Sequence, residues 1–317
     1  MDRNFAGVAE VAPVVRTALG RDLVAVQRLA GSSKKGVYRL TPAGDATAVL
    51  YVWSAAENYW PARDAPEDVF TDASGLDLFR AAHDALAALG VRTPRLLWAD
   101  DSHALFPADV AVVEDIRGGT LEDRLAHGPA PSTLDALRSA LTLMASVTDS
   151  RLGKVGRPDR SGRTCPEVIL QVARRDLTEA ADRVPALAAR RAALADRLDA
   201  LAAEIQPRPG HALVHGELGP DHVLLDDAAE PVLLDIEGLA FFDAEWEHAF
   251  LEMRFGDAYP ALRLPDLDQV RLRFYRLARH LSLVAGPLRL LDGDFPNRDF
   301  MLDIAHWHTG RVLSQLD

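Results

Sequence analysis

Residues 213–250 read LVHGELGPDHVLLDDAAEPVLLDIEGLAFFDAEWEHAF, and this stretch decides the fold. Two apolar runs, residues 223–225 and 232–234, flank the turn-forming segment DDAAEP, a pattern that predicts a β-hairpin. A hairpin brings its two ends together, so we expect the loop HGELGPDH to lie beside Asp235 and Glu237. Carboxylates and an imidazole that converge there could hold a divalent cation and activate a hydroxyl group.

The chain changes character near residue 117. Before it, short β-forming runs alternate with Gly, Pro, Asp and Ser, and one amphipathic helix interrupts them at about residues 75–89. After it the pattern is mostly helical, and Pro185 is expected to break the long Ala/Arg/Leu segment in two. We therefore predict a β-rich N-lobe, residues 1–116, and a larger helical C-lobe, residues 117–317, which contains the hairpin.

The composition is that of an acidic globular chain. Its 317 residues include 35 Lys plus Arg against 47 Asp plus Glu, a formal charge of −12, and 48% hydrophobic residues supply an ample core. The acidity argues against nucleic acid or an anionic membrane as a partner and favours a cationic small molecule. Cys165 is the only cysteine, which excludes an internal disulfide. Because no signal peptide or long apolar run is recognisable, we expect a cytoplasmic protein without a membrane span.

The stretch around the hairpin resembles the aminoglycoside phosphotransferase and choline kinase family. That family has the motif H-G-D-x-x-x-x-N, then a D-x-E or D-x-D pair, then a G-D-P-x-x-D-L-A-like stretch. His215, Gly216 and Asp235 match by residue, and Asp243 and Ala249 fit the later stretch. VVEDIRGGTLEDRL is similar to the family's interlobe hinge, and GVRTPRLLWAD to the run after its N-lobe helix.

The resemblance implies an α+β protein-kinase-like bilobal fold and transfer of the γ-phosphate of ATP or GTP to a hydroxyl group with Mg²⁺ or Mn²⁺. It places Glu217 at the acceptor hydroxyl, with His215 as a hydrogen-bonding residue of the same catalytic loop. Asp235 and His222 are the expected metal ligands. The nucleotide-binding candidates are Gly31, Ser32, Ser33, Lys34, Lys35, Gly36, Arg39, Tyr51, Val113, Glu114 and Ile116. The acceptor-binding candidates are Glu237, Asp243 and Glu247.

Three positions depart from the family pattern. Glu217 replaces the usual Asp, His222 replaces the Asn that helps to bind metal, and Tyr51 stands where the family has a lysine on the third strand. Glutamate keeps the carboxylate, and imidazole can bind divalent metals, although it suits Mn²⁺ better than Mg²⁺.

The loop GSSKKG, residues 31–36, offers a replacement for the missing strand lysine. Lys34, Lys35 and Lys154 are the only lysines of the chain, and two of them belong to this loop. Strand alternation predicts that only one of Lys34 and Lys35 points toward the nucleotide, and Arg39 is a reserve cation if it points inward. The loop is not a Walker A motif, because Val37 follows it where a lysine is required.

Other interpretations stay open at this point. The three departures also suit a pseudokinase or binding module, which keeps the fold but does not transfer phosphate. A third possibility is a kinase that phosphorylates a peptide Ser or Thr during natural-product maturation. His211, His215 and His222 could form a zinc triad. The aromatic run WSAAENYWP, residues 53–61, could be either a packed loop or a lid over the ligand.

Overall fold

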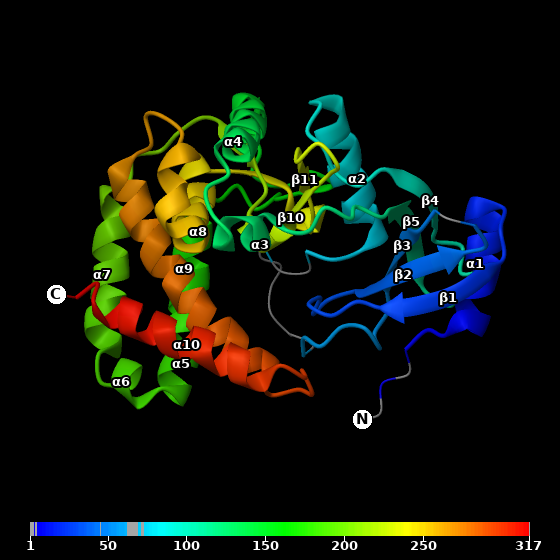
Figure 1. The fold of residues 1–317 in the computed structure, drawn as a ribbon. Coiled ribbons are helices and arrows are strands. Elements are labelled where there is room, and N and C mark those ends of the chain that lie inside the picture. The colour runs from blue at the N-terminus through cyan, green and yellow to red at the C-terminus, as the bar shows by residue number, and fades with distance from the viewer. Residues whose placement is uncertain (1–2, 4, 45, 62–68, 71–72, 317) are drawn as a thin grey trace. The chain divides into compact units, whose positions relative to one another are not determined.

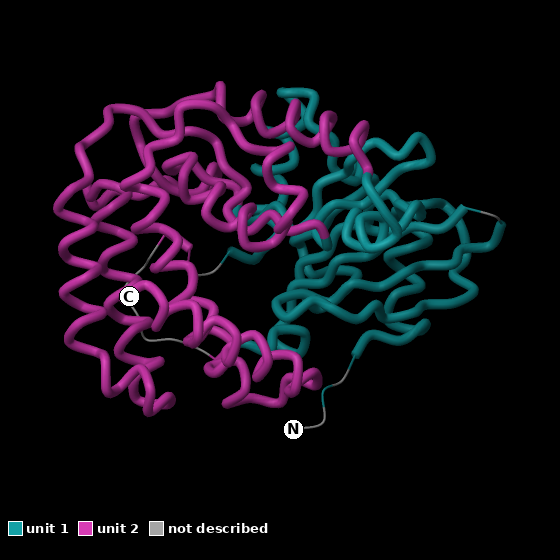
Figure 2. The backbone as a smooth tube through the Cα atoms, turned by 60° about the vertical axis from the view of Figure 1, so that its left-hand side comes forward, with its two compact units in different colours: residues 1–60, 72–129, 221–238 teal, residues 61–71, 130–220, 239–317 magenta. Residues whose placement is uncertain are grey.

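The computed structural model describes residues 3, 5–44, 46–61, 69–70 and 73–316 (Figure 1). These residues form a mixed fold with a small antiparallel sheet and a larger helical part, in agreement with the predicted class. The chain divides into two compact units (Figure 2). Unit 1 comprises residues 1–60, 72–129 and 221–238, and unit 2 comprises residues 61–71, 130–220 and 239–317.

The predicted lobes, residues 1–116 and 117–317, divide the chain differently from these two compact units. Residues 117–129 and the hairpin belong to the same compact unit as the β-rich part. Two backbone hydrogen bonds explain this grouping: Gly118 N–H donates to the Leu225 carbonyl at 3.1 Å, and Leu225 N–H donates to the Gly119 carbonyl at 3.0 Å. The division into lobes at residue 116 stays a prediction.

Unit 1 is built on an antiparallel sheet with the strand order β1-β2-β3-β5-β4. The central strand β3 reads AVLYVW and is buried at all but its last residue, because it pairs with β2 on one side and β5 on the other. Helix α1 contributes Val11, Val14 and Val15 to the core of this sheet. The bounds are α1 Val8–Leu19, β1 Leu23–Arg28, β2 Gly36–Pro42, β3 Ala48–Trp53, α2 Leu76–Ala88, β4 Leu96–Asp100 and β5 Asp109–Glu114.

The sequence pattern predicts α2 but not α1. Pro13 inside α1 removes a backbone donor and obscures the helical pattern. The helix is stabilised at its start instead, where Gly7 N–H donates to the Glu10 carboxylate at 3.0 Å.

The predicted hairpin forms in unit 1 from β10 Val223–Leu225 and β11 Pro231–Leu233, so its second strand begins one residue earlier than expected. Leu234 N–H donates to the His222 carbonyl at 2.8 Å, and Asp235 therefore leaves the hairpin close to His222. Asp235 has a positive φ of 56°, which turns the chain sharply after the strand. The neighbouring short elements are α3 Leu121–Ala126, η1 Pro220–His222 and η2 Ile236–Gly238.

Unit 2 combines helices with a second antiparallel sheet, in the order β6-β9-β12-β7-β8, which the sequence does not predict because its strands have only two to four residues. Pro185 ends the long helical segment as predicted, and α6 and α7 follow. The bounds are α4 Pro131–Ser146, β6 Thr148–Asp149, β7 Gly153–Lys154, β8 Arg157–Pro158, α5 Cys165–Arg183, α6 Pro185–Ala188, α7 Arg191–Glu204, β9 His211–Val214, β12 Ala240–Phe242, α8 Ala244–Phe255, η3 Gly256–Ala261, α9 Gln269–Leu290 and α10 Arg298–Leu313.

The helices of the described residues do not reach the combination of length and apolar character that a membrane span requires.

Gly118 provides a test of how the hairpin packs. A Cβ atom there would lie 2.2 Å from the Leu225 carbonyl oxygen, and backbone cannot move away cheaply. Gly118→Ala should therefore lower the free energy of unfolding by about 1–3 kcal/mol. Gly310→Ala, on the exposed side of α10 with open space around it, is the matched control and should stabilise the protein by up to about 1 kcal/mol. Urea unfolding measures both, and equal effects would contradict the packing described here.

Candidate active site

Lys35, directly before β2, provides a buried positive charge beside the end of the hairpin in unit 1. Its ammonium donates hydrogen bonds to Asp235 Oδ1 at 2.9 Å and to Glu237 Oε1 at 2.5 Å. Burial disfavours a charged lysine, but the two carboxylates outweigh this effect and raise the pKa of Lys35. The side chain is therefore an ammonium ion at neutral pH.

Tyr51 lies against this ammonium. The centroid of the tyrosine ring is 5.0 Å from Nζ of Lys35, and the ring makes edge-to-face contacts with Trp53 and Phe79. Burial raises the pKa of Tyr51 to about 12, so the phenol is neutral at pH 7. Trp53 also donates to Glu237 Oε1, at 3.3 Å. A neutral aromatic ring thus occupies the position on β3, while the positive charge comes from the loop that precedes β2.

Asp235 has the properties of a metal ligand. Desolvation tends to raise the pKa of its carboxyl group, but Lys35 and His222 outweigh desolvation and lower that pKa. The side chain is 47% exposed, so a ligand can reach it. Glu237 Oε2 is buried and accepts no hydrogen bond within the described part of the chain. Lys35 balances only one of the two carboxylate charges, and oxygen donors with residual negative charge suit Mg²⁺ or Mn²⁺. That His222 is a further metal ligand stays a prediction.

The aromatic run of residues 53–61 packs against the loop of residues 31–36. Tyr59 N–H donates to the Ser33 carbonyl at 2.8 Å, and the Trp60 indole donates to Ser33 Oγ at 2.9 Å. A Cβ atom at Gly36 would lie 2.6 Å from the Glu57 carboxylate, so this run also requires the glycine. Within unit 1, these contacts favour the packed-loop interpretation over the lid.

The two loop lysines have different surroundings. Lys34 Nζ lies 5.7 Å from the centroid of a Trp60 ring, whereas Lys35 reaches both Asp235 and Glu237. Arg39 forms an ion pair with Asp115 at 2.9 Å. A direct contact of Arg39 with phosphate stays a prediction.

The predicted hinge lies at the end of β5. Val113 and Ile116 are buried there. Glu114 accepts hydrogen bonds from the Arg95 backbone at 3.2 Å and from the Arg92 guanidinium at 3.3 Å. Nucleotide binding by these hinge residues stays a prediction.

The predicted catalytic loop follows β9 in unit 2 and is held through both peptide groups of one residue, Gly216. Gly216 N–H donates to Glu247 Oε2 at 2.5 Å, and the Gly216 carbonyl accepts a hydrogen bond from Arg279. Gly216 has a φ of 92°, which a residue with a Cβ atom rarely adopts. The ring of His215 accepts a hydrogen bond from Glu217 N–H at 3.4 Å. The backbone that carries Glu217 is therefore held by three side chains.

Arg279 is a component of this site that the sequence pattern does not single out, because it is one of many arginines on the long helix α9. Its guanidinium lies 3.5 Å from the centroid of a Trp246 ring. Burial lowers the pKa of Arg279 to about 10, against the opposing effects of Glu217 and Glu247. Burial also raises the pKa of Glu247 to about 7, although Gly216 N–H and Arg279 oppose the shift.

The three predicted acceptor-binding carboxylates have separate partners. Glu237 pairs with Lys35 and Glu247 with Gly216 N–H, whereas Asp243 accepts hydrogen bonds from Arg271 and Tyr275. All three are buried, and their part in acceptor binding stays a prediction.

The chain was compared with protein-family models, curated sequences and solved structures. A family model described as the phosphotransferase enzyme family matches residues 26–258. No curated protein sequence matches the chain.

Three solved structures share the fold. A thermostable mutant of aminoglycoside phosphotransferase APH(4)-Ia, in ternary complex with ADP and hygromycin B, is 18% identical with a TM-score of 0.63, covering 97% of this chain and 98% of that one. Spectinomycin phosphotransferase APH(9)-Ia, in complex with ADP and spectinomycin, is 12% identical with a TM-score of 0.65 and coverages of 99% and 98%. Choline kinase LicA from Streptococcus pneumoniae is 12% identical with a TM-score of 0.64 and coverages of 96% and 97%. These similarities confirm the predicted kinase-like fold.

Glu247 makes the stability of the protein depend on pH. Its pKa of about 7 in the folded protein exceeds its ordinary value of 4.5, so the folded state binds a proton more tightly than the unfolded state. The free energy of unfolding should therefore fall as the pH rises from about 5 to 7. Glu247→Gln keeps an acceptor for Gly216 N–H and should flatten this dependence.

Urea unfolding of parent and variant between about pH 5 and 8 measures the effect, since their difference isolates the titration of one group. Glu230→Gln, at an exposed hairpin position, is the control and should leave the profile unchanged. A Glu247→Gln profile parallel to that of the parent would contradict the assigned pKa.

Proposed function

This chain belongs to the phosphotransferase enzyme family, and we propose that it moves the γ-phosphate of ATP or GTP to a hydroxyl group of a small molecule, with Mg²⁺ or Mn²⁺ as cofactor. The observation that carries the proposal is the contact of Lys35 with Asp235 and Glu237. Phosphoryl transfer depends on positioning and on charge neutralisation, and an ammonium beside acidic metal ligands supplies both.

Nucleotide binding exchanges the partners of Lys35 in this proposal. The ammonium leaves Asp235 and contacts phosphate oxygens, and the freed carboxylate, with His222, holds the metal. When bound, the metal neutralises phosphate charge and orients the phosphates. Tyr51 remains neutral beneath the ammonium, so it does not compete for the phosphates. This exchange compensates for the lysine that the third strand lacks.

Glu217 acts on the acceptor. Its carboxylate accepts the hydroxyl proton as the acceptor oxygen bonds to the γ-phosphorus and the bond to the bridging oxygen of the nucleoside diphosphate breaks. The additional methylene of glutamate, relative to aspartate, calls for a well-fixed backbone. The contacts of Gly216 with Glu247 and Arg279 support this role, because they hold both peptide groups of the residue that precedes Glu217.

The acceptor is proposed to be a cationic small molecule. The net charge of −12 favours such a molecule over an anionic one. The names of the structural relatives, which refer to aminoglycosides, spectinomycin and choline, point to the same class. The specific observation in favour of a pseudokinase is the replacement of two catalytic-loop residues by Glu217 and His222, and the tests below separate the two functions.

The first test concerns Asp235. Nucleotide with metal should raise the melting temperature of the parent, by the equivalent of about 2.7 kcal/mol at a ligand concentration a hundredfold above Kd. Asp235→Asn should abolish the part of this stabilisation that requires metal. Thermal shifts with ATP and GTP, each with Mg²⁺ and Mn²⁺, measure it, and Asp227→Asn in the exposed hairpin turn is the control. An Asp235→Asn variant that binds nucleotide and metal like the parent would remove Asp235 from the site.

The second test concerns Glu217. Glu217→Gln should reduce turnover by about 10²–10⁴-fold while nucleotide affinity stays the same, because it removes only the proton acceptor. Transfer from radiolabelled nucleotide to hygromycin B, spectinomycin, choline and a serine peptide measures turnover. Unchanged turnover would exclude Glu217 from the reaction. A parent that binds nucleotide with metal and phosphorylates none of the acceptors would favour the pseudokinase.

A further inference from the structure

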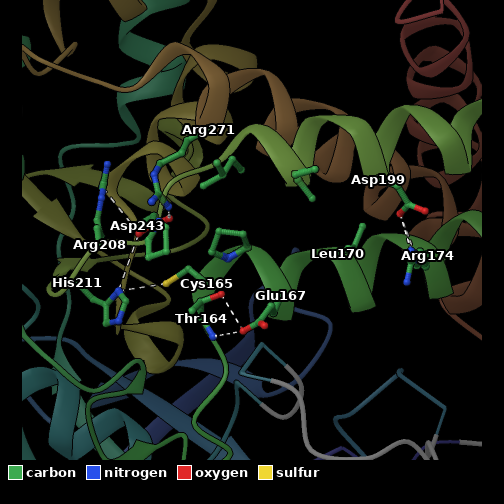
Figure 3. Close-up of a pocket in the computed structure, with 15 residues that line it drawn as sticks. Thr164, Cys165, Glu167, Leu170, Arg174, Asp199, Arg208, His211, Asp243 and Arg271 are labelled. Atoms are coloured by element: carbon green, nitrogen blue, oxygen red, sulfur yellow. Dashed lines mark hydrogen bonds and ion pairs between the residues drawn. The ribbon is translucent and has the colours of Figure 1, made fainter.

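Three potential metal ligands meet within unit 2 (Figure 3). Cys165 begins α5, His211 begins β9 and Asp243 directly precedes α8. His211 Nδ1 lies 3.2 Å from Cys165 Sγ and 3.9 Å from Asp243 Oδ1. One ligand atom of each residue lies within 4.8 Å of the other two, and all three residues are buried. In a tetrahedral zinc site such atoms are roughly 3.3–3.8 Å apart, so shifts of under about 1 Å would complete the geometry.

Asp243 has one carboxylate oxygen that is not hydrogen-bonded. Its Oδ2 accepts from Arg271 and Tyr275, and the residue is fully buried. Its Oδ1, the oxygen that faces His211, has no hydrogen-bond partner among the described residues. The oxygen has only longer contacts, with Arg208 at 3.7 Å and His211 at 3.9 Å, and a metal ion would bind it more closely.

A cavity reaches the three ligands. It has a volume of about 510 Å³, and its lining includes Cys165, His211 and Asp243 at one end and Arg174 and Asp199 elsewhere. Figure 3 shows α5 along one side of this cavity. The cavity leaves room for an ion to enter and for a fourth ligand that the protein does not supply.

The charged groups around the cluster are balanced in pairs. Arg271 bonds to Asp243, and Arg208 bonds to both oxygens of Glu245 at 2.9 and 3.0 Å. Arg208 also lies 3.7 Å from Asp243 Oδ1. A divalent ion that displaces the thiol proton of Cys165 adds one net positive charge to this set. The fourth ligand is therefore expected to be an anion, such as hydroxide, with Arg208 close to it.

We propose that Cys165, His211 and Asp243 form a zinc site with an anionic fourth ligand. Sulfur, imidazole nitrogen and carboxylate oxygen together are ligands typical of Zn²⁺, whereas Mg²⁺ prefers oxygen alone. On binding, the thiol proton leaves and the sulfur–metal bond forms. The site is independent of the proposed phosphotransfer. It joins the starts of α5, β9 and α8. Strand β9 leads to Gly216 of the predicted catalytic loop, and α8 carries Glu247, which accepts a hydrogen bond from Gly216 N–H.

The test uses the full chain after removal of metal by a chelator. One equivalent of Zn²⁺ is added, unbound ion is removed by gel filtration, and the retained zinc is measured by mass spectrometry. The parent should retain about one Zn²⁺ per chain and melt at a higher temperature than the metal-free protein. Cys165→Ser and His211→Gln should lose both effects. Asp235→Asn, which changes the proposed nucleotide metal site, should retain the zinc and thereby exclude that site as its location.

Co²⁺ provides a measurement on the parent alone. Because Cys165 is the only cysteine, a near-ultraviolet thiolate-to-cobalt charge-transfer band can arise only from this residue. The proposal predicts the band. A folded parent that lacks the band and retains no zinc would overturn the proposal, as would folded Cys165→Ser protein that retains as much zinc as the parent.

Discussion

The proposed nucleotide site depends on one electrostatic arrangement: the buried ammonium of Lys35 lies between the carboxylates of Asp235 and Glu237. Lys35 donates hydrogen bonds to Asp235 and to one oxygen of Glu237, whereas the other oxygen of Glu237 has no hydrogen-bond partner among the described residues. In the proposed function, the residual negative charge suits a divalent ion, and the lysine ammonium suits phosphate. The aromatic run of residues 53–61 supports this arrangement by fixing the loop that carries Lys35.

In unit 2, two side chains hold the backbone of the predicted catalytic loop. Glu247 and Arg279 hold the N–H and the carbonyl of Gly216 from opposite sides, and both have pKa values shifted by burial. Both side chains are buried, so the loss of either contact would leave a polar group of the loop without its hydrogen bond. The two contacts therefore favour the observed conformation of the backbone that precedes Glu217.

The sequence predicts the elements that are marked by turn-forming residues or by a regular spacing of apolar residues. The hairpin, α2 and the break at Pro185 follow from turn residues and apolar periodicity, and all three are present in the structure. The short strands of the second sheet, such as β9 and β12, are too brief to leave a periodic signal, and Pro13 hides α1. The sequence also predicts that either Lys34 or Lys35, in the loop of residues 31–36, replaces the lysine missing from the third strand. It cannot identify Arg279 as a partner of Gly216, because that contact joins residues 63 positions apart.

The most direct test of the relocated lysine is to move it back to the strand. Nucleotide binding with metal, measured by calorimetry, should be lost in Lys35→Ala and nearly unchanged in Lys34→Ala. The double variant Lys35→Ala with Tyr51→Lys should recover much of the binding, since Tyr51 lies next to the place that the ammonium occupies. Nucleotide affinity that survives Lys35→Ala unchanged, or that falls only with Lys34→Ala, would contradict the account.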